Sequence, residues 1–139
     1  MEIRQARDDD VAVMCAADRI AVDQKKRQEV IRKLVREGTA YVAVLGGAVA
    51  GYAVLEHSFF ERGFMSLLMV RQAHRRRGVG SALVRHVEGL CESDRIFTST
   101  NQSNLPMQSL LQKLGYRHSG TVEDLDPGDP ELFYSRQVR

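Results

Sequence analysis

Residues 70–81 read VRQAHRRRGVGS, and the fold is decided around this stretch. The residues before it, FMSLLMV at 64–70, are almost all apolar, which is typical of a central strand. The residues after it, 79–93, carry apolar side chains at helical spacing. A strand therefore ends here, a basic loop containing Gly78 and Gly80 follows, and a helix begins.

The loop has the chemistry of an anion site. The first N–H groups of the helix point back into the loop, and together with the helix dipole they favour a negative charge. Arg75, Arg76 and Arg77 add donors that suit phosphate oxygens. The local sequence therefore predicts a pyrophosphate ligand.

Strands and helices alternate along the rest of the chain. Two β-rich runs flank Gly46–Gly47, and DPGDP at 126–130 is a strong turn signal between two further strands. The elements expected are strands at 2–6, 40–45, 48–60, 64–70, 95–100, 116–125 and 131–138, and helices at 11–20, 23–37, 79–93 and 104–114. One helix separates the strands 64–70 and 95–100, so a right-handed crossover predicts that these two are parallel within a mixed sheet.

The composition is that of an ordinary globular protein. The chain has 139 residues, 43% of them hydrophobic, so one domain over 1–139 is expected. A net charge of +2 does not favour a nucleic-acid partner, although three consecutive arginines could touch RNA. No apolar run approaches the ~20 residues of a membrane span, and the N-terminus has no apolar signal segment. Cys15 and Cys91 lack metal-ligand spacing, so we expect a cytoplasmic protein without a metal.

The basic loop resembles motif A of the GNAT (Gcn5-related) N-acetyltransferases, which reads Arg/Gln-x-x-Gly-x-Gly/Ala. Arg75 takes the first position, and Gly78 and Gly80 take the glycine positions. Leu68-x-Val70, ahead of the loop, matches the strand that leads into that motif.

A second segment and the order of elements support the same resemblance. Asn104, a short helix and Leu114-Gly115-Tyr116 are similar to the family's Asn-helix-Leu-Gly-Phe/Tyr segment. The resemblance implies an α/β fold with a single domain and a mixed, mostly antiparallel sheet of about seven strands. It also implies helices on both faces of the sheet and splayed parallel central strands.

The resemblance implies acetyl-CoA as the cofactor. Backbone N–H groups around Arg76–Ser81 would hold the pyrophosphate, and main-chain groups of Leu68 and Val70 would pair with the pantetheine arm. A backbone N–H near Met69 or Val70 would meet the oxyanion formed on attack. Asn104 would cap its helix and also contact the cofactor. The cofactor-binding residues expected on this basis are Leu68, Met69, Val70, Arg75, Arg76, Arg77, Gly78, Val79, Gly80, Ser81 and Asn104.

At the two positions where relatives carry a general base and a general acid, this chain departs from the family pattern. Some relatives carry a Glu eleven residues before the first residue of motif A, and this chain has Phe64 there. Many carry a Tyr seven residues after the Asn, and this chain has Leu111. The family's usual general base and general acid therefore cannot be assigned in this chain.

Strand geometry suggests a different base. If residues 61–62 form a two-residue turn, Phe59 pairs with Phe64 and His57 pairs with Ser66. These four side chains then share one face, and in relatives the position of Phe64 faces the substrate cleft. An ordinary His pKa of ~6.5 suits a base near neutral pH, although His57 could equally be a satisfied strand residue. The candidate bases are His57, followed by Glu56 and Glu61.

The final hairpin is acidic around its turn. In the family this hairpin borders the acceptor site, where carboxylates such as Asp126 and Asp129 would attract a cationic amine. Acidic side chains on a loop are also often just solvated turn residues, and the basic face of the helix at 23–37 would favour an anionic acceptor if it faced the site. The residues expected to bind the acceptor are Phe59, Phe64, Ser66, Asp126, Asp129 and Tyr134.

The expected function is transfer of an acetyl group from acetyl-CoA to a primary amine. Direct attack is expected, because no Ser or Cys stands out as an activated nucleophile. The acceptor would be a small cationic amine, or a protein N-terminus or lysine. The alternative is an acetyl-CoA-binding regulatory module with little catalysis that acts on a protein partner, which the departures at Phe64 and Leu111 favour. Homodimers are common in the family, although no sequence feature names an interface.

Overall fold

The computed structural model of the chain describes residues 1–18 and 20–139. Its elements follow the predicted order, with short 3-10 turns at Asp8–Asp10 and Gln72–His74. The elements are β1 (Glu2–Gln5), α1 (Val11–Ala17), α2 (Lys25–Arg36), β2 (Ala40–Leu45), β3 (Ala48–Phe59), β4 (Arg62–Val70), α3 (Val79–Leu90), β5 (Arg95–Asn101), α4 (Leu105–Lys113), β6 (Arg117–Val122) and β7 (Glu131–Gln137).

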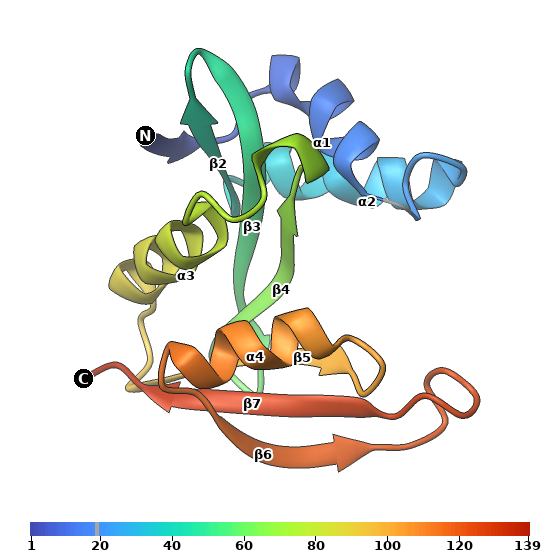
Figure 1. Cartoon of the computed structure of the whole chain (residues 1–139), viewed down its shortest axis with the longest axis vertical. Coiled ribbons are helices and arrows are strands. Elements are labelled where there is room, and N and C mark those ends of the chain that lie inside the picture. The colour runs from blue at the N-terminus through green and yellow to red at the C-terminus, as the bar shows by residue number, and fades with distance from the viewer. Residues whose placement is uncertain (19) are drawn as a thin grey trace. The chain divides into compact units, whose positions relative to one another are not determined.

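The seven strands of the described residues form one mixed sheet in the order β1-β2-β3-β4-β5-β7-β6 (Figure 1). β4 and β5 are parallel, as predicted, and β1–β2, β2–β3, β5–β7 and β6–β7 are antiparallel. The parallel pairing joins Gly63–Met65 to Ile96–Thr98, although β4 continues to Val70. The parallel pairing therefore involves only the first part of β4.

Contacts within the chain divide it into two compact units. The N-terminal unit comprises residues 1–55 and 67–87, and the C-terminal unit comprises residues 56–66 and 88–139. β3 and β4 therefore each contribute to both units.

The core of the N-terminal unit lies between the sheet and the helices α1 and α2. Met14, Ile31 and Tyr52 are almost completely buried there. Gly51, the neighbour of Tyr52 on β3, faces α3 instead, since a Cβ at this position would lie 3.2 Å from Val79 Cγ1. Successive strand residues point to opposite faces, so α1 and α2 cover one face of this part of the sheet and α3 covers the other (Figure 1). The prediction of helices on both faces is confirmed in this unit.

A buried carboxylate holds the connection between α1 and α2. Asp18 has no exposed surface. Its Oδ1 accepts hydrogen bonds from the N–H groups of Ile20 at 2.8 Å and Ala21 at 3.2 Å. Its Oδ2 accepts from Arg27 Nε at 3.0 Å and from the Tyr52 hydroxyl at 3.3 Å. Burial by itself would raise the pKa of Asp18, but the guanidinium and the two N–H groups together hold that pKa below its ordinary value.

The variant Asp18→Asn should therefore lower the free energy of unfolding at pH 7 by about 1–3 kcal/mol, since buried donors lose a charged acceptor. Because folding depresses the pKa, the stabilisation by Asp18 is present above the unfolded value of ~3.9 and is lost as the pH falls through the lower folded value. Urea unfolding should be measured for the wild type and the variant across this acid range. The difference between their free energies of unfolding should shrink as the pH falls. A difference that stays constant would contradict a role for the charge.

The C-terminal unit combines β5, β6 and β7 with α4. β5 and β7 pair from Arg95–Asn101 against Glu131–Gln137, and β6 lies on the outer side of β7. Leu111 of α4 is fully buried. Asn104 caps α4, as predicted, because its Oδ1 accepts a hydrogen bond from the Met107 N–H at 3.2 Å.

The hairpin between β3 and β4 turns one residue earlier than predicted. β3 ends at Phe59 and β4 begins at Arg62, so the turn residues are Phe60 and Glu61. Both have positive φ, 50° and 65°, which is typical of a type I′ turn. Such turns strongly prefer Asn and Gly, so this sequence carries no signal for one here. Phe59 therefore lies opposite Arg62, and the predicted pairings of Phe59 with Phe64 and of His57 with Ser66 are wrong.

Candidate active site

The segment that follows β4 has a curled backbone. After the turn at Gln72–His74, Arg76 and Gly78 adopt positive φ angles of 65° and 76°, and α3 begins at Val79. Glycine adopts such angles readily, whereas Arg76 is a non-glycine residue held in the left-handed region. Alternating backbone conformations of this kind form concave nests of N–H groups that bind anions.

The start of α3 adds further donors beside this loop. The Ala82 N–H donates to the Gly78 carbonyl at 3.0 Å and so begins the helical hydrogen bonds. The N–H groups of residues 79–81 precede that bond and have no acceptor within the helix. With the positive end of the helix dipole, they favour an anionic group in the loop.

The arginine side chains of the loop are available to a ligand. Arg75, Arg76 and Arg77 are exposed. Within the described ranges, none of the three forms an ion pair with a carboxylate. Their uncompensated positive charge favours a ligand that carries several negative charges.

The end of β4 offers backbone groups that β3 does not use. The Arg71 N–H donates to the Ala50 carbonyl at 2.8 Å, so Arg71 and Met69 direct their backbone groups toward β3. The backbone groups of Leu68 and Val70 point the other way, and the pairing of β4 with β5 has ended at Met65. An extended ligand could pair with them as an added strand would. Between the two oxyanion donors considered from sequence, this geometry favours the N–H of Val70 over that of Met69.

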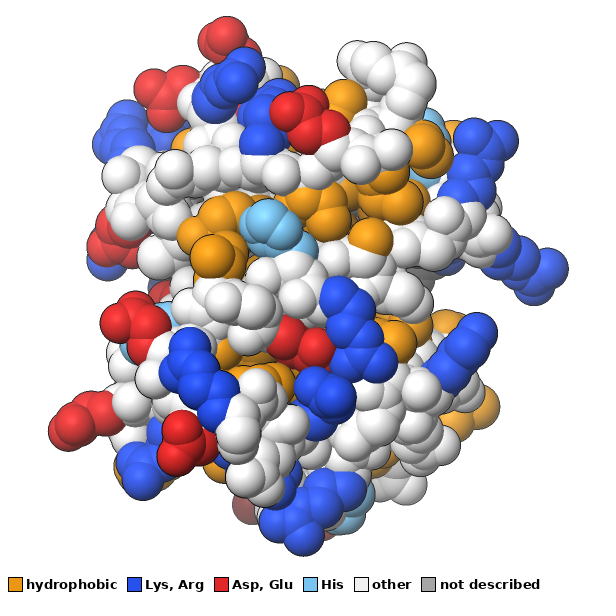
Figure 2. Space-filling view, turned by 90° about the vertical axis from the view of Figure 1, so that its left-hand side faces the viewer, with side chains coloured by type: hydrophobic (Ala, Val, Ile, Leu, Met, Phe, Trp, Pro, Cys, Tyr) orange, Lys and Arg blue, Asp and Glu red, His pale blue; other side chains and the backbone are white. Residues whose placement is uncertain are grey.

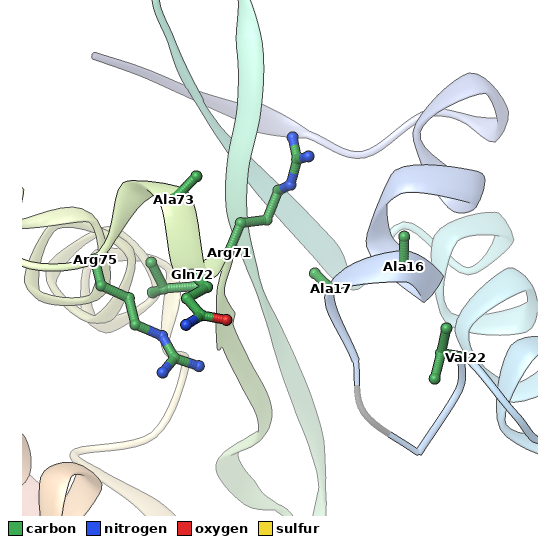
Figure 3. Close-up of a pocket in the computed structure, with 8 residues that line it drawn as sticks. Ala16, Ala17, Val22, Arg71, Gln72, Ala73 and Arg75 are labelled. Carbon is green, nitrogen blue, oxygen red and sulfur yellow. The ribbon is translucent and has the colours of Figure 1, made fainter.

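A pocket of about 380 Å³ lies beside the loop within the N-terminal unit (Figure 3). Ala16, Ala17 and Val22, from α1 and the connection to α2, form one wall. The opposite wall comes from residues 70–73 and Arg75. Asp18 hydrogen-bonds within the first wall and so fixes its position. A Cβ at Gly78 would meet no heavy atom within 4 Å, so the backbone of the loop is also accessible. These features fit a ligand with a pyrophosphate and an extended arm.

His57 is engaged in a hydrogen bond with the connection between α3 and β5. Its Nε2 accepts from the Glu92 N–H at 3.0 Å, and its Nδ1 lies 3.8 Å from the Glu92 carboxylate. The first contact occupies the lone pair that a general base would use. Of the other two candidates, Glu61 lies exposed at the tip of the β3–β4 turn, and Glu56 is half-buried on β3.

The carboxylates of the final hairpin hold the end of β5. Asn101 Nδ2 donates to Asp126 Oδ2 at 2.9 Å. The backbone N–H and the hydroxyl of Ser103 both donate to Asp129, at 3.0 and 2.6 Å. Both acidic side chains thus have structural partners, which weakens the case that they attract an acceptor. Tyr134 is buried with its ring against His118, and alternation along β7 turns it away from the face that carries Phe133.

Phe59 and Phe64 do share a face, although not through the predicted pairing. Their ring centroids are 4.8 Å apart. Phe97 on β5 and Phe133 on β7 join them, with centroids 5.3 and 5.8 Å from that of Phe59. Sequence reasoning missed these two residues. The alternation of side chains along a strand could have placed each residue on one face of its own strand. That β5 and β7 are neighbours follows only from the strand order of the sheet.

The described residues add little support for other classes of ligand. No group of three or more His, Cys, Asp or Glu side chains in 1–18 and 20–139 is arranged to hold a metal ion. No helix within these residues is long and apolar enough to cross a membrane. On the face shown in Figure 2, Lys and Arg side chains are interspersed with Asp and Glu.

Solved structures of acetyltransferases share this fold. A GNAT-family acetyltransferase from Bacillus cereus is 30% identical, with a TM-score of 0.90 over 98% of this chain and 96% of the other. Ard1 from Thermoplasma volcanium is 20% identical, with a TM-score of 0.87 over 99% and 97%. The Salmonella typhimurium protein yncA, solved with its cofactor acetyl-CoA, is 19% identical, with a TM-score of 0.78 over 100% and 94%. Sequence identities as low as those of the Thermoplasma and Salmonella proteins show that the fold is alike and nothing more.

The family itself follows from the sequence match. The model of the acetyltransferase (GNAT) family matches residues 9–116, which is most of the chain. The chain therefore belongs to the GNAT family of acetyltransferases, and its cofactor is acetyl-CoA. No curated protein matches the sequence.

Gly78→Val should weaken acetyl-CoA binding by roughly tenfold or more, the equivalent of ~1.4 kcal/mol. A branched side chain at this position would strain the backbone and stand beside the N–H donors of the loop. Gly46→Val is the matched control, because Gly46 also has positive φ and open space around its Cβ position. Calorimetric titration should show lost affinity in the first variant alone. Equal affinities in both variants and the wild type would contradict this placement of the cofactor.

His57→Ala should leave the pH profile of turnover unchanged, since the accepting nitrogen is already held by the Glu92 N–H. Initial rates from pH 5.5 to 9 would be compared with those of His86→Ala, a second histidine substitution away from this hydrogen bond. Loss of turnover together with a shifted acid limb in His57→Ala alone would restore the histidine as the base.

Proposed function

We propose that the chain transfers the acetyl group of acetyl-CoA to a primary amine by direct attack. The observation that carries this proposal is the junction of β4 and α3. There, the outward backbone groups of Leu68 and Val70 adjoin a loop with two left-handed residues and three arginines that form no ion pair within the described residues. Family membership supplies the class of reaction, and the junction supplies groups suited to each part of the cofactor.

The roles of the residues follow the chemistry of the cofactor. When bound, acetyl-CoA supplies an activated acetyl thioester. The N–H groups of Arg76–Ser81 and the side chains of Arg75–Arg77 would neutralise the pyrophosphate. The backbone of Leu68 and Val70 would hold the arm extended, and the Val70 N–H would stabilise the negative charge that develops on the carbonyl oxygen.

The reaction balances without a further co-reactant. The amine must be neutral to attack, so a protonated acceptor first loses a proton to solvent or to a base. A bond then forms between the amine nitrogen and the carbonyl carbon, and the C–S bond breaks. The amine nitrogen loses its second proton, and the sulfur leaves as the thiol after gaining one. We assign neither transfer to a particular side chain, because His57 is hydrogen-bonded elsewhere and Leu111 is a buried apolar residue.

A second candidate is an acetyl-CoA-binding module that regulates a protein partner. Phe64 and Leu111 favour it, because they stand where some relatives carry a Glu and many carry a Tyr, and neither side chain can move a proton. Both candidates bind acetyl-CoA at the same site. Only the first predicts acetylation of an amine at an appreciable rate.

Turnover with an amine separates the two candidates. We expect calorimetric titration to show binding of acetyl-CoA, and thiol release to rise on addition of at least one amine from a panel of alkyl, aryl and polyamines. The panel would also include peptides with a free N-terminus. Binding without acetylation of any amine would contradict the enzyme and favour the regulatory module. Absence of binding would contradict both.

A further inference from the structure

All five phenylalanines of the chain gather in the C-terminal unit. Phe59 is the centre of the cluster, with ring centroids 4.8 to 5.8 Å from those of the other four. The residues come from β3, the β3–β4 turn, β4, β5 and β7. We call this group, Phe59, Phe60, Phe64, Phe97 and Phe133, the phenylalanine cluster.

The phenylalanine cluster lies on the face of the sheet that α4 does not cover. Phe97 and Phe133 are half-buried, whereas the alternate residues Ile96 and Tyr134 are almost completely buried on the other face. Burial of that other face accords with the position of α4, which runs along β5 and β7 (Figure 1). Phe60 at the turn is 76% exposed. Several aromatic rings thus form a partly open apolar surface, and surfaces of this kind mark binding sites.

Polar groups border the cluster where the parallel pairing ends. Ser66 follows Met65, and Ser99 follows Thr98, the last residues paired between β4 and β5. Strand alternation puts Ser66 on the face of Phe64, and its hydroxyl oxygen is buried without a hydrogen-bond partner. A buried hydroxyl without a partner is unfavourable unless a ligand supplies one.

A carboxylate stands at the same border. Ser99 lies opposite Phe133 in the β5–β7 register, and its hydroxyl donates to Glu131 Oε2 at 2.7 Å. Glu131 is two residues before Phe133 on β7 and therefore shares its face. Glu131 is half-buried, and within the described residues no Lys or Arg forms an ion pair with it. Among the described side chains, the Ser99 hydroxyl donates to this negative charge and no cation neutralises it, so Glu131 is suited to bind a cation.

We propose that this face binds the acceptor as a small primary amine carried on an aromatic or branched aliphatic body. Glu131, with the hydroxyls of Ser66 and Ser99, receives the ammonium group. The rings of Phe64, Phe97 and Phe133 contact the apolar body. This inference rests on the proposed acetyl transfer, and it adds the chemical class of the acceptor.

Charge and apolar surface together select this class over a polyamine. A polyamine brings two or more charges, and the cluster would leave the additional charges against benzene rings without a second carboxylate. A single ammonium beside Glu131 is matched by the one charge of that carboxylate, whereas a second ammonium held at the rings would lose its hydration without gaining a paired charge. An apolar body also removes ring surface from water, at roughly 25 cal/mol per Å².

Transfer kinetics with matched amines test the assignment. We expect kcat/KM for 2-phenylethylamine to exceed that for putrescine by roughly tenfold or more, which corresponds to ~1.4 kcal/mol. Glu131→Gln should reduce kcat/KM for 2-phenylethylamine by a similar factor, mainly through KM, whereas the exposed Glu123→Gln should not. Phe133→Leu keeps an apolar side chain and should erode the preference for the aromatic amine, and Leu125→Ala is its exposed control.

Two further measurements keep the outcomes distinct. Acetyl-CoA affinity is measured in every variant, and sedimentation is measured over a range of protein concentrations. Retained cofactor binding with equal use of both amines would overturn the acceptor class and leave acetyl transfer intact. If the wild-type protein does not bind acetyl-CoA, the proposed acetyl transfer itself would be overturned. A dimer that Phe133→Leu dissociates, with unchanged amine preference, would show that the face binds a second copy and would also overturn the inference.

Ser66→Ala gives an independent readout of the same site. Ligand-observed NMR with 2-phenylethylamine and the full chain should show weaker binding in this variant than in Ser58→Ala, whose hydroxyl lies on an exposed part of β3. Binding that is unchanged by Ser66→Ala and by Glu131→Gln would contradict an ammonium site at this border.

Discussion

β4 is longer than the part of it that pairs with β5, and the proposed cofactor site depends on the unpaired part. Backbone N–H and C=O groups need partners, and a strand that loses one neighbour part-way must find them elsewhere. The parallel pairing ends at Met65, whereas the strand runs on to Val70. The backbone groups of Leu68 and Val70 that point away from β3 lie outside that pairing, and the loop that follows β4 brings N–H donors and arginines to the end of the same strand.

The surrounding N-terminal unit holds this end of β4 in place. Arg71 is tied to β3 through its own N–H and through a guanidinium that donates to the Val49 carbonyl at 3.1 Å. Gly51 allows β3 to approach β4 closely, since a Cβ there would lie 2.5 Å from the Met69 carbonyl oxygen. The hydrogen bonds of Asp18 fix the far wall of the pocket. Such preorganisation means that little conformational freedom is lost when a ligand binds.

The sequence predicted most of the fold and only part of the candidate site. Apolar periodicity and the glycines located the β4–loop–α3 junction, and one intervening helix was enough to make β4 and β5 parallel. The β3–β4 turn was misplaced because Phe60 and Glu61 adopt left-handed backbone without the residues that usually signal it. The partners of His57, Asp126 and Asp129 come from distant segments. Residue types alone therefore suggested a base at His57 and acceptor binding at the two aspartates, where the structure shows hydrogen bonds. Phe97 and Phe133 needed the strand order before they could be placed together.

Hydrogen exchange of individual backbone amides, measured by NMR with and without CoA, tests the central claim most directly. An amide that bonds to the ligand is protected from exchange. The account predicts that CoA protects the amides of Leu68, Val70 and residues 76–81, while the amide of Arg71, already bonded to Ala50, changes little. CoA binding that leaves the Leu68, Val70 and loop amides unprotected would contradict the claim that the freed end of β4 and the loop after it hold the cofactor.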